Sequence, residues 1–271
     1  SFLAKCYSIE KNKKIFFFIV DHKLRKSSTY EANLVKNKLR QFEIKSDILT
    51  IKKNIKSSNL QSFARENRYK LLFEKSSKKK INTVLTAHHE DDLLENFFIR
   101  LLRGSGLKGL ISFGKIKSKV NFDDKIFVLR PLLNTSKKDL IYILKNTFKF
   151  NVDDPSNKDD KFLRVKVRKL ISKLEKDGLS FNKFKISLNN LSKSNNAIDY
   201  YVQENIKNNS SHLNFNKAII LNDSFFKQPN EIVFRSLSQL IQKVGKKNTL
   251  TRGTKIESLL NYLNSRNCYN K

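Results

Sequence analysis

The sequence predicts an α/β protein whose parallel sheet is covered by helices on both faces, followed by a smaller, mostly helical second part. Through the first part of the chain, short apolar runs that are typical of buried strands alternate with longer segments of helical periodicity. This alternation stops near residue 185, where Lys-, Asn- and Ser-rich helical segments begin. We therefore expect one domain over residues 1–185 and a second over residues 186–271.

Three strands and two helices are expected to alternate first. The runs at residues 15–20, 46–51 and 81–89 have the length and the β-branched or aromatic content of buried strands. The segments 29–42 and 59–76 between them have helical spacing. Such alternation indicates parallel pairing, and ligands of parallel sheets bind beyond the carboxyl ends of the strands.

Further elements follow along the chain. A helix over residues 93–102 would turn four apolar side chains inward: Leu94, Phe97, Phe98 and Leu101. We expect a strand over 125–133, a helix over 136–148, and a turn-rich loop that leads into a basic helix over 151–171. In the second part, one short extended piece is expected at 212–221.

Composition limits the class of protein. The 271 residues are 39% hydrophobic, so a real core can form. No apolar run has the length of a membrane span, and the first residues are too polar for a secretory signal. Cys6 and Cys268 form no zinc-binding or CxxC pattern, so a reduced, cytoplasmic setting is expected. The sequence contains no Met, and we expect residues upstream of Ser1.

The charge favours a polyanionic partner. The chain carries 55 Lys and Arg against 25 Asp and Glu, a net charge of +30. So strong a positive field attracts nucleic acid. Lys, Asn, Ile and Phe are all abundant, as in proteins of AT-rich genomes, and part of the charge can reflect that bias.

Acids and histidines gather directly after the strand expected at 81–89: His88, His89, Glu90, Asp91, Asp92 and Glu95. Helix capping is one interpretation, because acids in a first turn typically gain ~0.3–1 kcal/mol from the helix dipole. Capping does not explain two adjacent histidines at a strand end. The HExxH spacing of zinc proteases is excluded because Leu93 stands where the second His is needed. A magnesium site fits better, since Mg²⁺ uses one or two carboxylates plus substrate phosphates. Both interpretations stay open.

Other polar segments carry weaker signals. Gly104 and Gly106 beside Arg103 permit close backbone approach to a phosphate, or simply end a helix. Asp21, His22 and Arg25 leave a strand in a basic loop, which either borders a nucleotide or is only solvated.

Two arginine pairs lie at helical spacing. Arg65 and Arg68 are three residues apart, and Arg164 and Arg168 are four apart, downstream of the turn-forming DPSN at 154–157. Arg65 and Arg68 could contact phosphate or RNA, or simply face solvent. Arg164 and Arg168 could clamp a phosphate or an acid, so they either face RNA or have a structural role.

Together, and in this order, these segments resemble the tRNA(Ile)-lysidine synthetase family of PP-loop ATPases. The matching motifs span roughly residues 1–170: VDHxLR, AR..RY, TAHHxDD..E, RGSGxxGL, RPLL, and DPSN with two arginines after it. The resemblance implies an adenine nucleotide α-hydrolase-like, Rossmann-like fold. The family's phosphate loop, SGGxDS, would precede the first helix, so Ser1 is expected to be its last serine or the next residue. We expect this truncated chain by itself to be inactive.

The resemblance also implies a two-step reaction. ATP adenylates the 2-oxygen of the wobble cytidine in tRNA(Ile) with a CAU anticodon, and the amine of free L-lysine then displaces AMP to give lysidine. Such chemistry needs Mg²⁺ and cations near the α-phosphate, a base for the lysine ammonium, and a surface for the tRNA. A homodimer is left open, and no membrane is expected.

The implied roles fall into four groups. Catalytic residues would be His88, His89, Asp91, Asp92 and Glu95, of which Asp91 and Asp92 would bind Mg²⁺. ATP-binding residues would be Ser1, Asp21, His22, Arg25, Arg103, Gly104 and Gly106. Residues contacting RNA would be Arg65, Arg68, Arg164 and Arg168. The second domain would recognise the tRNA body.

Two alternatives compete with this interpretation. Sulfur-inserting PP-loop enzymes also modify tRNA, but they commonly depend on paired cysteines, and the two cysteines here are isolated. A non-catalytic RNA-binding protein would explain the charge and leave the acid–histidine cluster without a role.

Overall fold

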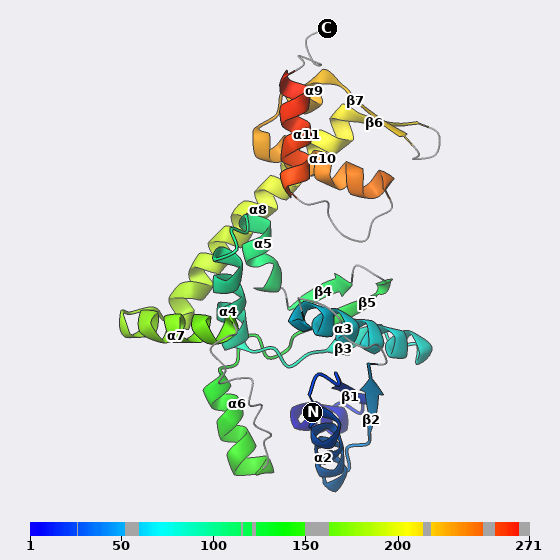
Figure 1. Ribbon diagram of the computed structural model, residues 1–271, viewed down its shortest axis with the longest axis vertical. Coiled ribbons are helices and arrows are strands. Elements are labelled where there is room, and N and C mark those ends of the chain that lie inside the picture. The colour runs from blue at the N-terminus through cyan, green and yellow to red at the C-terminus, as the bar shows by residue number, and fades with distance from the viewer. Residues whose placement is uncertain are drawn as a thin grey trace. The chain divides into compact units, whose positions relative to one another are not determined.

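The computed structural model describes residues 1–25, 27–51, 60–114, 116–120, 123–149, 163–213, 218–245 and 253–265 (Figure 1). Contacts between residues divide the chain into two compact units. The first unit is Ser1–Glu95 with Lys115–Ile171, and the second is Asn96–Gly114 with Ser172–Lys271. The functional division expected at residue 185 stays a prediction. The DPSN segment and Cys268 lie outside the described residues.

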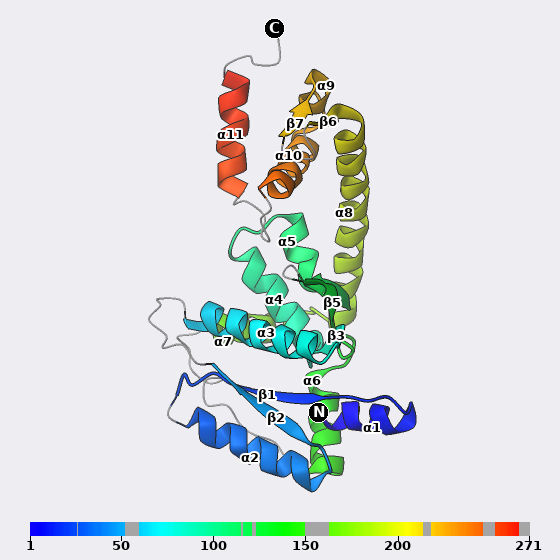
Figure 2. The ribbon, with the colours of Figure 1, turned by 90° about the vertical axis from the view of Figure 1, so that its right-hand side faces the viewer.

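The first strands of the first unit form a parallel pair. β1 (Phe17–Asp21) pairs with β2 (Ser46–Thr50), so that Asp21 lies opposite Thr50 at the carboxyl end of both strands. Helix α2 (Ser28–Gln41) packs against both strands (Figure 2). It buries Ala32 and Leu39, as its periodicity predicts.

A second small sheet lies in the same unit. β3 (Thr83–Leu85) and β5 (Asp123–Leu129) are parallel, and β4 (Lys117–Val120) pairs antiparallel with β5. Parallel pairing is therefore confirmed within each pair. The single continuous sheet that was expected is not found, because in the described part of the chain the two ladders are separate. The apolar periodicity of a segment indicates that it is buried but does not identify the strand with which it pairs. The strand β4, which is rich in Lys, was not predicted from the sequence.

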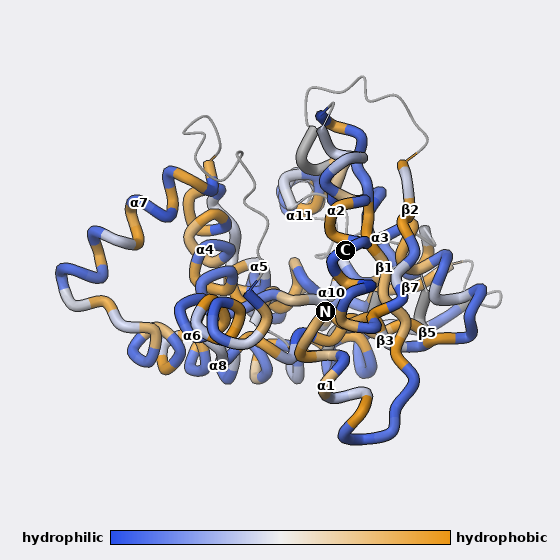
Figure 3. Tube along the Cα trace, turned by 90° about the horizontal axis from the view of Figure 1, so that it is seen from below, coloured by the Kyte–Doolittle hydropathy of each residue, from blue (hydrophilic) through white to orange (hydrophobic). Residues whose placement is uncertain are grey.

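The remaining helices that include first-unit residues follow the predicted order. They are α1 (Phe2–Glu10), α3 (Leu60–Lys78), α4 (Glu90–Leu101), α6 (Lys137–Ile143), continued by a π-helical turn (Leu144–Phe148), and α7 (Leu163–Lys176). Polar and apolar residues alternate along α7 (Figure 3). A core of Phe73, Val84, Ile126 and Val128 joins α3 to β3 and β5. Burying each such side chain contributes roughly 1.5–3 kcal/mol.

Helix α4 differs from its prediction at both ends. It begins at Glu90, three residues earlier than expected, because the acids at 90–92 favour a helix amino terminus. Leu94 is buried and Phe97 and Phe98 are partly buried, as expected. Leu101 is 49% exposed, so its predicted inward position is wrong. It is the last residue of the helix, and the chain turns away immediately after it.

The second unit is mostly helical, as its composition predicts. Its elements beyond the ends of α4 and α7 are α5 (Leu107–Ile111), a 3-10 turn (Ser112–Gly114), α8 (Phe181–Asn209), β6 (Ser210–Leu213), β7 (Ala218–Leu221), α9 (Asp223–Phe226), α10 (Asn230–Val244) and α11 (Gly253–Ser265). The hairpin of β6 and β7 corresponds to the expected extended piece. Apolar residues of α9, α10 and α11 form the core, with Phe225 fully buried.

Candidate active site

The carboxyl end of β1 is organised by Asp21, which is only 2% exposed. Its Oδ1 accepts hydrogen bonds from the backbone N–H of Lys23 (3.0 Å) and from the hydroxyl of Ser28 (2.8 Å). Its Oδ2 accepts from the hydroxyl of Thr29 (2.7 Å). Burial opposes ionisation, but these donors lower the pKa of Asp21 below its ordinary value. These contacts tie the loop after β1 to the start of α2. The role of Asp21 in nucleotide binding stays a prediction.

Arg25 and His22 of this loop have partners within the protein. Arg25 forms an ion pair with Glu31 of α2 at 3.1 Å. His22 accepts hydrogen bonds from Arg68 of α3, which was predicted to contact RNA. Burial and the nearby Arg68 lower the pKa of His22, while Asp21 opposes this effect. His22 is therefore neutral at pH 7.

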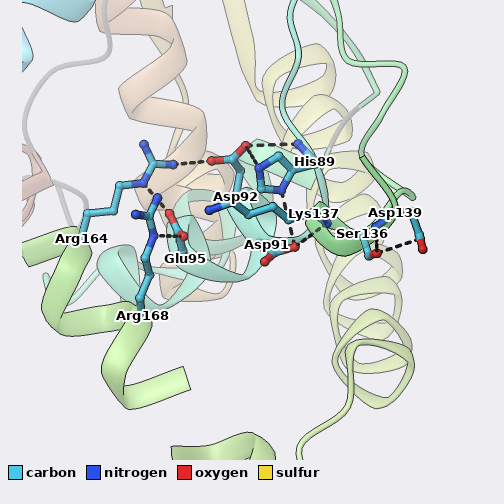
Figure 4. Close-up of polar contacts among 9 residues, drawn as sticks. All are labelled: His89, Asp91, Asp92, Glu95, Ser136, Lys137, Asp139, Arg164 and Arg168. Atoms are coloured by element: carbon cyan, nitrogen blue, oxygen red, sulfur yellow. Dashed lines mark hydrogen bonds and ion pairs between the residues drawn. The ribbon is translucent and has the colours of Figure 1, made fainter. Parts of the chain in front are cut away.

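The acid–histidine cluster lies after β3, which ends at Leu85 and not at the expected residue 89, and in the first turns of α4. Figure 4 shows its polar contacts. The ring of His89 lies between two carboxylates, with Nδ1 3.5 Å from Asp91 Oδ1 and Nε2 3.4 Å from Asp92 Oδ2. Asp91 Oδ1 also accepts the backbone N–H of Lys137, the first residue of α6 (3.1 Å). Asp92 Oδ2 accepts the backbone N–H of His89 (3.1 Å). The first turn of α4 is thus held to the start of α6.

Glu95 is the buried centre of this cluster, with 3% of its surface exposed. Its two oxygens accept the Nε–H groups of Arg164 and Arg168, each at 2.5 Å. A further N–H of Arg164 donates to Asp92 Oδ1 at 2.7 Å. The spacing of four residues along α7 places both arginines on one face. That face turns toward the acids of α4, so the arginines contact an acid, one of the two partners that the sequence left open. Contact with RNA stays an untested prediction.

The pKa values of the two adjacent histidines are shifted in opposite directions. Burial, with the nearby charges of Arg130, Arg65 and Arg164, lowers the pKa of His88 to about 4, although Asp92 opposes the shift. Burial also disfavours a charged His89, but the carboxylates of Asp91 and Asp92 prevail and raise its pKa above 6.5. His89 in turn lowers the pKa of Asp91, against the effect of burial. Paired groups with divergent pKa values are typical of acid–base sites.

Arg130 is a site residue that the sequence interpretation left without a role. It follows β5, is 8% exposed, and burial lowers its pKa. Its position was available from the sequence as the arginine of RPLL at the end of an apolar run. Because Leu85 lies opposite Leu129 in the parallel pair, Arg130 and the residues after β3 share one sheet edge. Arg65, Arg130 and Arg164 therefore gather positive charge near His88.

Four further residues were predicted to bind ATP. Arg103, Gly104 and Gly106 belong to the second unit, where Gly104 adopts φ +67° and ends the turn after α4. Ser1 precedes α1 and accepts the N–H of Lys5 with its backbone oxygen. Their roles in ATP binding stay predictions.

Magnesium fits only part of the predicted ligand set. Among the described residues, no group of three or more His, Cys, Asp or Glu side chains is arranged to hold a metal. Asp92 directs its two oxygens to Arg164 and His89, so it suits a metal poorly. The side chain of Asp91 is 45% exposed, and one carboxylate with substrate phosphates is enough for Mg²⁺. Asp91 is therefore the residue that fits the ion.

Parallel strand pairs with polar residues at their carboxyl ends define the class of nucleotide-binding α/β proteins. A family model described as a PP-loop domain matches residues 1–175, and the chain belongs to this family.

Several curated relatives carry one name. The tRNA(Ile)-lysidine synthase of Rickettsia rickettsii (strain Sheila Smith) is 36% identical over 173 residues, which are 64% of this chain and 35% of that protein. The synthase of Orientia tsutsugamushi (strain Boryong) is 37% identical over 174 residues, 64% of this chain and 38% of that protein. The synthase of Rickettsia bellii (strain OSU 85-389) is 35% identical over 190 residues, 69% of this chain and 43% of that protein. The chain thus spans less than half the length of these relatives, and the predicted resemblance is confirmed.

A solved structure shows the same fold. The U34-tRNA thiolase NcsA from Methanococcus maripaludis superposes with a TM-score of 0.57 over 70% of this chain and 66% of that one. At 16% identity this likeness concerns the fold alone. Within the described parts of the chain, no helix has the length and apolar character to cross a membrane.

Proposed function

We propose that the protein ligates L-lysine to the wobble cytidine of tRNA(Ile) with a CAU anticodon, at the expense of ATP, and so forms lysidine. The observation that carries this proposal is the identity of 35–37% with proteins named tRNA(Ile)-lysidine synthase. Sulfur insertion has less support, because the likeness to a tRNA thiolase rests on 16% identity. A purely RNA-binding role would leave the split pKa values of His88 and His89 without a use.

The arginines near His88 suit the first step, the transfer of the adenylyl group. Negative charge grows on the α-phosphate as the cytidine oxygen attacks, and fixed cations stabilise that charge most where water is excluded. Arg130 is buried and lies close to His88, whereas Arg164 is paired with Asp92 and Glu95 and Arg65 is exposed, so Arg130 is the arginine that suits this charge best. His88, neutral at pH 7, adds a ring that can donate or accept a hydrogen bond without adding charge.

Asp91 and His89 suit the second step, the attack by lysine. The lysine ammonium must lose a proton before its nitrogen can attack, and a base with a pKa near 7 is best for this. His89 has a raised pKa and lies between two carboxylates that stabilise its protonated form. We assign proton transfer to His89, and to Asp91 the binding of the ammonium or of Mg²⁺. When bound, the metal would neutralise phosphate charge.

The arginines of α7 have a positioning role in this proposal. Arg164 and Arg168 form ion pairs with Glu95 and Asp92 and so offset the charge of these two acids. Contact with RNA then falls to exposed cations such as Arg65 and to the excess of lysine over the whole chain. The net charge of +30 is consistent with such a surface.

The test is incorporation of labelled lysine by the complete gene product. We expect labelled L-lysine to enter tRNA(Ile) with a CAU anticodon only when ATP and Mg²⁺ are present, and a tRNA with a GAU anticodon to serve as the control. Incorporation of labelled sulfur in place of lysine would favour the thiolase alternative. Binding of tRNA without any ATP–pyrophosphate exchange would favour the non-catalytic protein.

A further inference from the structure

A histidine–arginine pair at the carboxyl end of β1 has a defined protonation pattern. Arg68 Nε lies 3.2 Å and Arg68 Nη2 lies 3.0 Å from Nε2 of His22. A guanidinium has N–H donors and no acceptor. Nε2 of His22 must therefore accept, and a neutral imidazole that accepts at Nε2 carries its proton on Nδ1.

The other ring nitrogen of His22, Nδ1, is a buried donor without a hydrogen-bond partner among the described residues. Buried donors in native proteins are nearly always satisfied, and an unsatisfied one costs roughly 1–3 kcal/mol. Such a group at a strand end is expected to meet a ligand.

The backbone around His22 is fixed. Asp21, immediately before it, accepts hydrogen bonds from Ser28 and Thr29 of α2 and from the backbone of Lys23. Lys23, immediately after it, adopts φ +50°, a left-handed conformation that is uncommon outside glycine. The hydrogen bond from the N–H of Lys23 to Asp21 stabilises this turn. The imidazole is thus held from both sides of the chain and from α3.

We propose that Arg68 is a positioning residue that holds His22 as an Nδ1–H donor, and that this donor binds an acceptor atom of the adenine nucleotide. The inference rests on the proposed function, because it places the nucleotide beyond the carboxyl end of β1. It also removes Arg68 from the RNA contacts that the sequence suggested. The charged groups that face His22 are Arg68 from α3 and Asp21 from β1, and Arg65 and Arg164 lie near Arg68.

The proton position can be measured directly in the complete gene product. Long-range ¹H–¹⁵N correlation of labelled histidine reports which nitrogen is protonated, and His22→Gln identifies the signal of His22 by its loss. We expect Nδ1–H in the unaltered protein and a shift of the proton toward Nε2 in Arg68→Leu. Arg68→Lys, which keeps a donor, should restore the Nδ1–H form in part. Lys70→Leu removes a neighbouring exposed cation of α3 and is the control. An Nε2–H ring in the unaltered protein, or a ring unaffected by Arg68→Leu, would overturn the inference.

ATP affinity tests what the donor does. The side-chain amide of Gln reaches the position of Nε2, whereas the amide of Asn lies near Nδ1. We expect His22→Gln to weaken ATP binding about tenfold, the effect of one lost hydrogen bond, and His22→Asn to weaken it less. Arg68→Leu should weaken binding in the unaltered background and have little further effect in His22→Asn. Equal losses in the two His22 variants would contradict the ligand role. If the unaltered protein does not bind ATP, both the proposed function and the assignment of a nucleotide to His22 are wrong. The tautomer measurement still decides whether Arg68 positions His22.

Discussion

Glu95 and Arg164 meet at 2.5 Å although 69 positions separate them in the sequence. Arg168 approaches the other oxygen of the same carboxylate at the same distance. The buried Glu95, the last acid of the acid–histidine cluster, therefore joins α4 to α7, and Asp92 adds a second contact through Arg164. The two arginines thus pair with acids of the cluster.

Removing this acid should destabilise the first unit. Glu95→Ala removes the carboxylate that Arg164 and Arg168 share. We expect a loss of about 2–3 kcal/mol, below the full value for a buried pair because Arg164 keeps Asp92 and both arginines are partly exposed. Urea unfolding measures this loss. Glu10→Ala, at an exposed ion pair of α1, is the matched control. A loss for Glu95→Ala no larger than that of the control would show that the arginines find other partners.

Asp91 should be needed for chemistry and not for tRNA binding. Asp91→Asn keeps the size of the side chain and removes its charge, so we expect lysine incorporation to fall by about a hundredfold or more, the usual effect of losing a group that handles protons or metal. Affinity for the CAU tRNA should stay within about twofold, since an acid adds nothing to phosphate binding. Asp139→Asn, in the first turn of α6, is the control. Unchanged turnover in Asp91→Asn would show that Asp91 only stabilises the start of α4.

The two adjacent histidines should titrate on opposite sides of pH 6.5. NMR titration, with His88→Gln and His89→Gln to assign the signals, should give a pKa of about 4 for His88 and a raised pKa for His89. If both histidines titrate together near pH 6.5, their environments do not shift the two pKa values apart.

The lowered pKa of His88 has a consequence for stability. The unfolded chain takes up a proton at His88 near pH 6.5, before the folded protein does. The stability that depends on neutral His88 is therefore present above pH 6.5 and lost as the pH falls toward 4. The loss should be about 2 kcal/mol, after a reduction for partial exposure to solvent. Urea unfolding at pH 7 and pH 4.5 should show a smaller decrease in His88→Gln than in the unaltered protein, and equal decreases would contradict the assignment.

Arg65 should contact RNA where Arg68 does not. Arg65 is exposed and lies over the ring of Tyr69, at 5.5 Å from its centre. We expect Arg65→Gln to reduce the slope of log K against log salt by about one, as for one lost phosphate contact. The slope for Arg68→Gln should change less because its guanidinium binds His22. Arg40→Gln on α2 controls for the loss of one charge. A larger change for Arg68 than for Arg65 would reverse this assignment.

Local structure was largely predictable because helical and strand periodicity are properties of neighbouring residues. The strands at Phe17–Asp21 and Ser46–Thr50 and the helix at Ser28–Gln41 agree with the expected ranges to within a few residues. Partners distant in the sequence were harder to predict. A pair of arginines at a spacing of four has the same pattern whether it faces RNA or a buried acid. The sequence therefore left a phosphate or an acid open as the partner of Arg164 and Arg168 and did not identify Glu95.

The sequence by itself determined the strand and helix order of the first part, the acid–histidine cluster at a strand end, and the resemblance to the PP-loop enzymes, since all three depend on residue types at fixed short spacings. Only the tertiary structure decided which groups each charged side chain contacts. It pairs Asp21 with Ser28, Arg68 with His22, and Arg164 and Arg168 with Glu95. The physical reason is that burial and the nearest opposite charge set the energy of an ionised group, and both depend on segments that meet only in the folded chain.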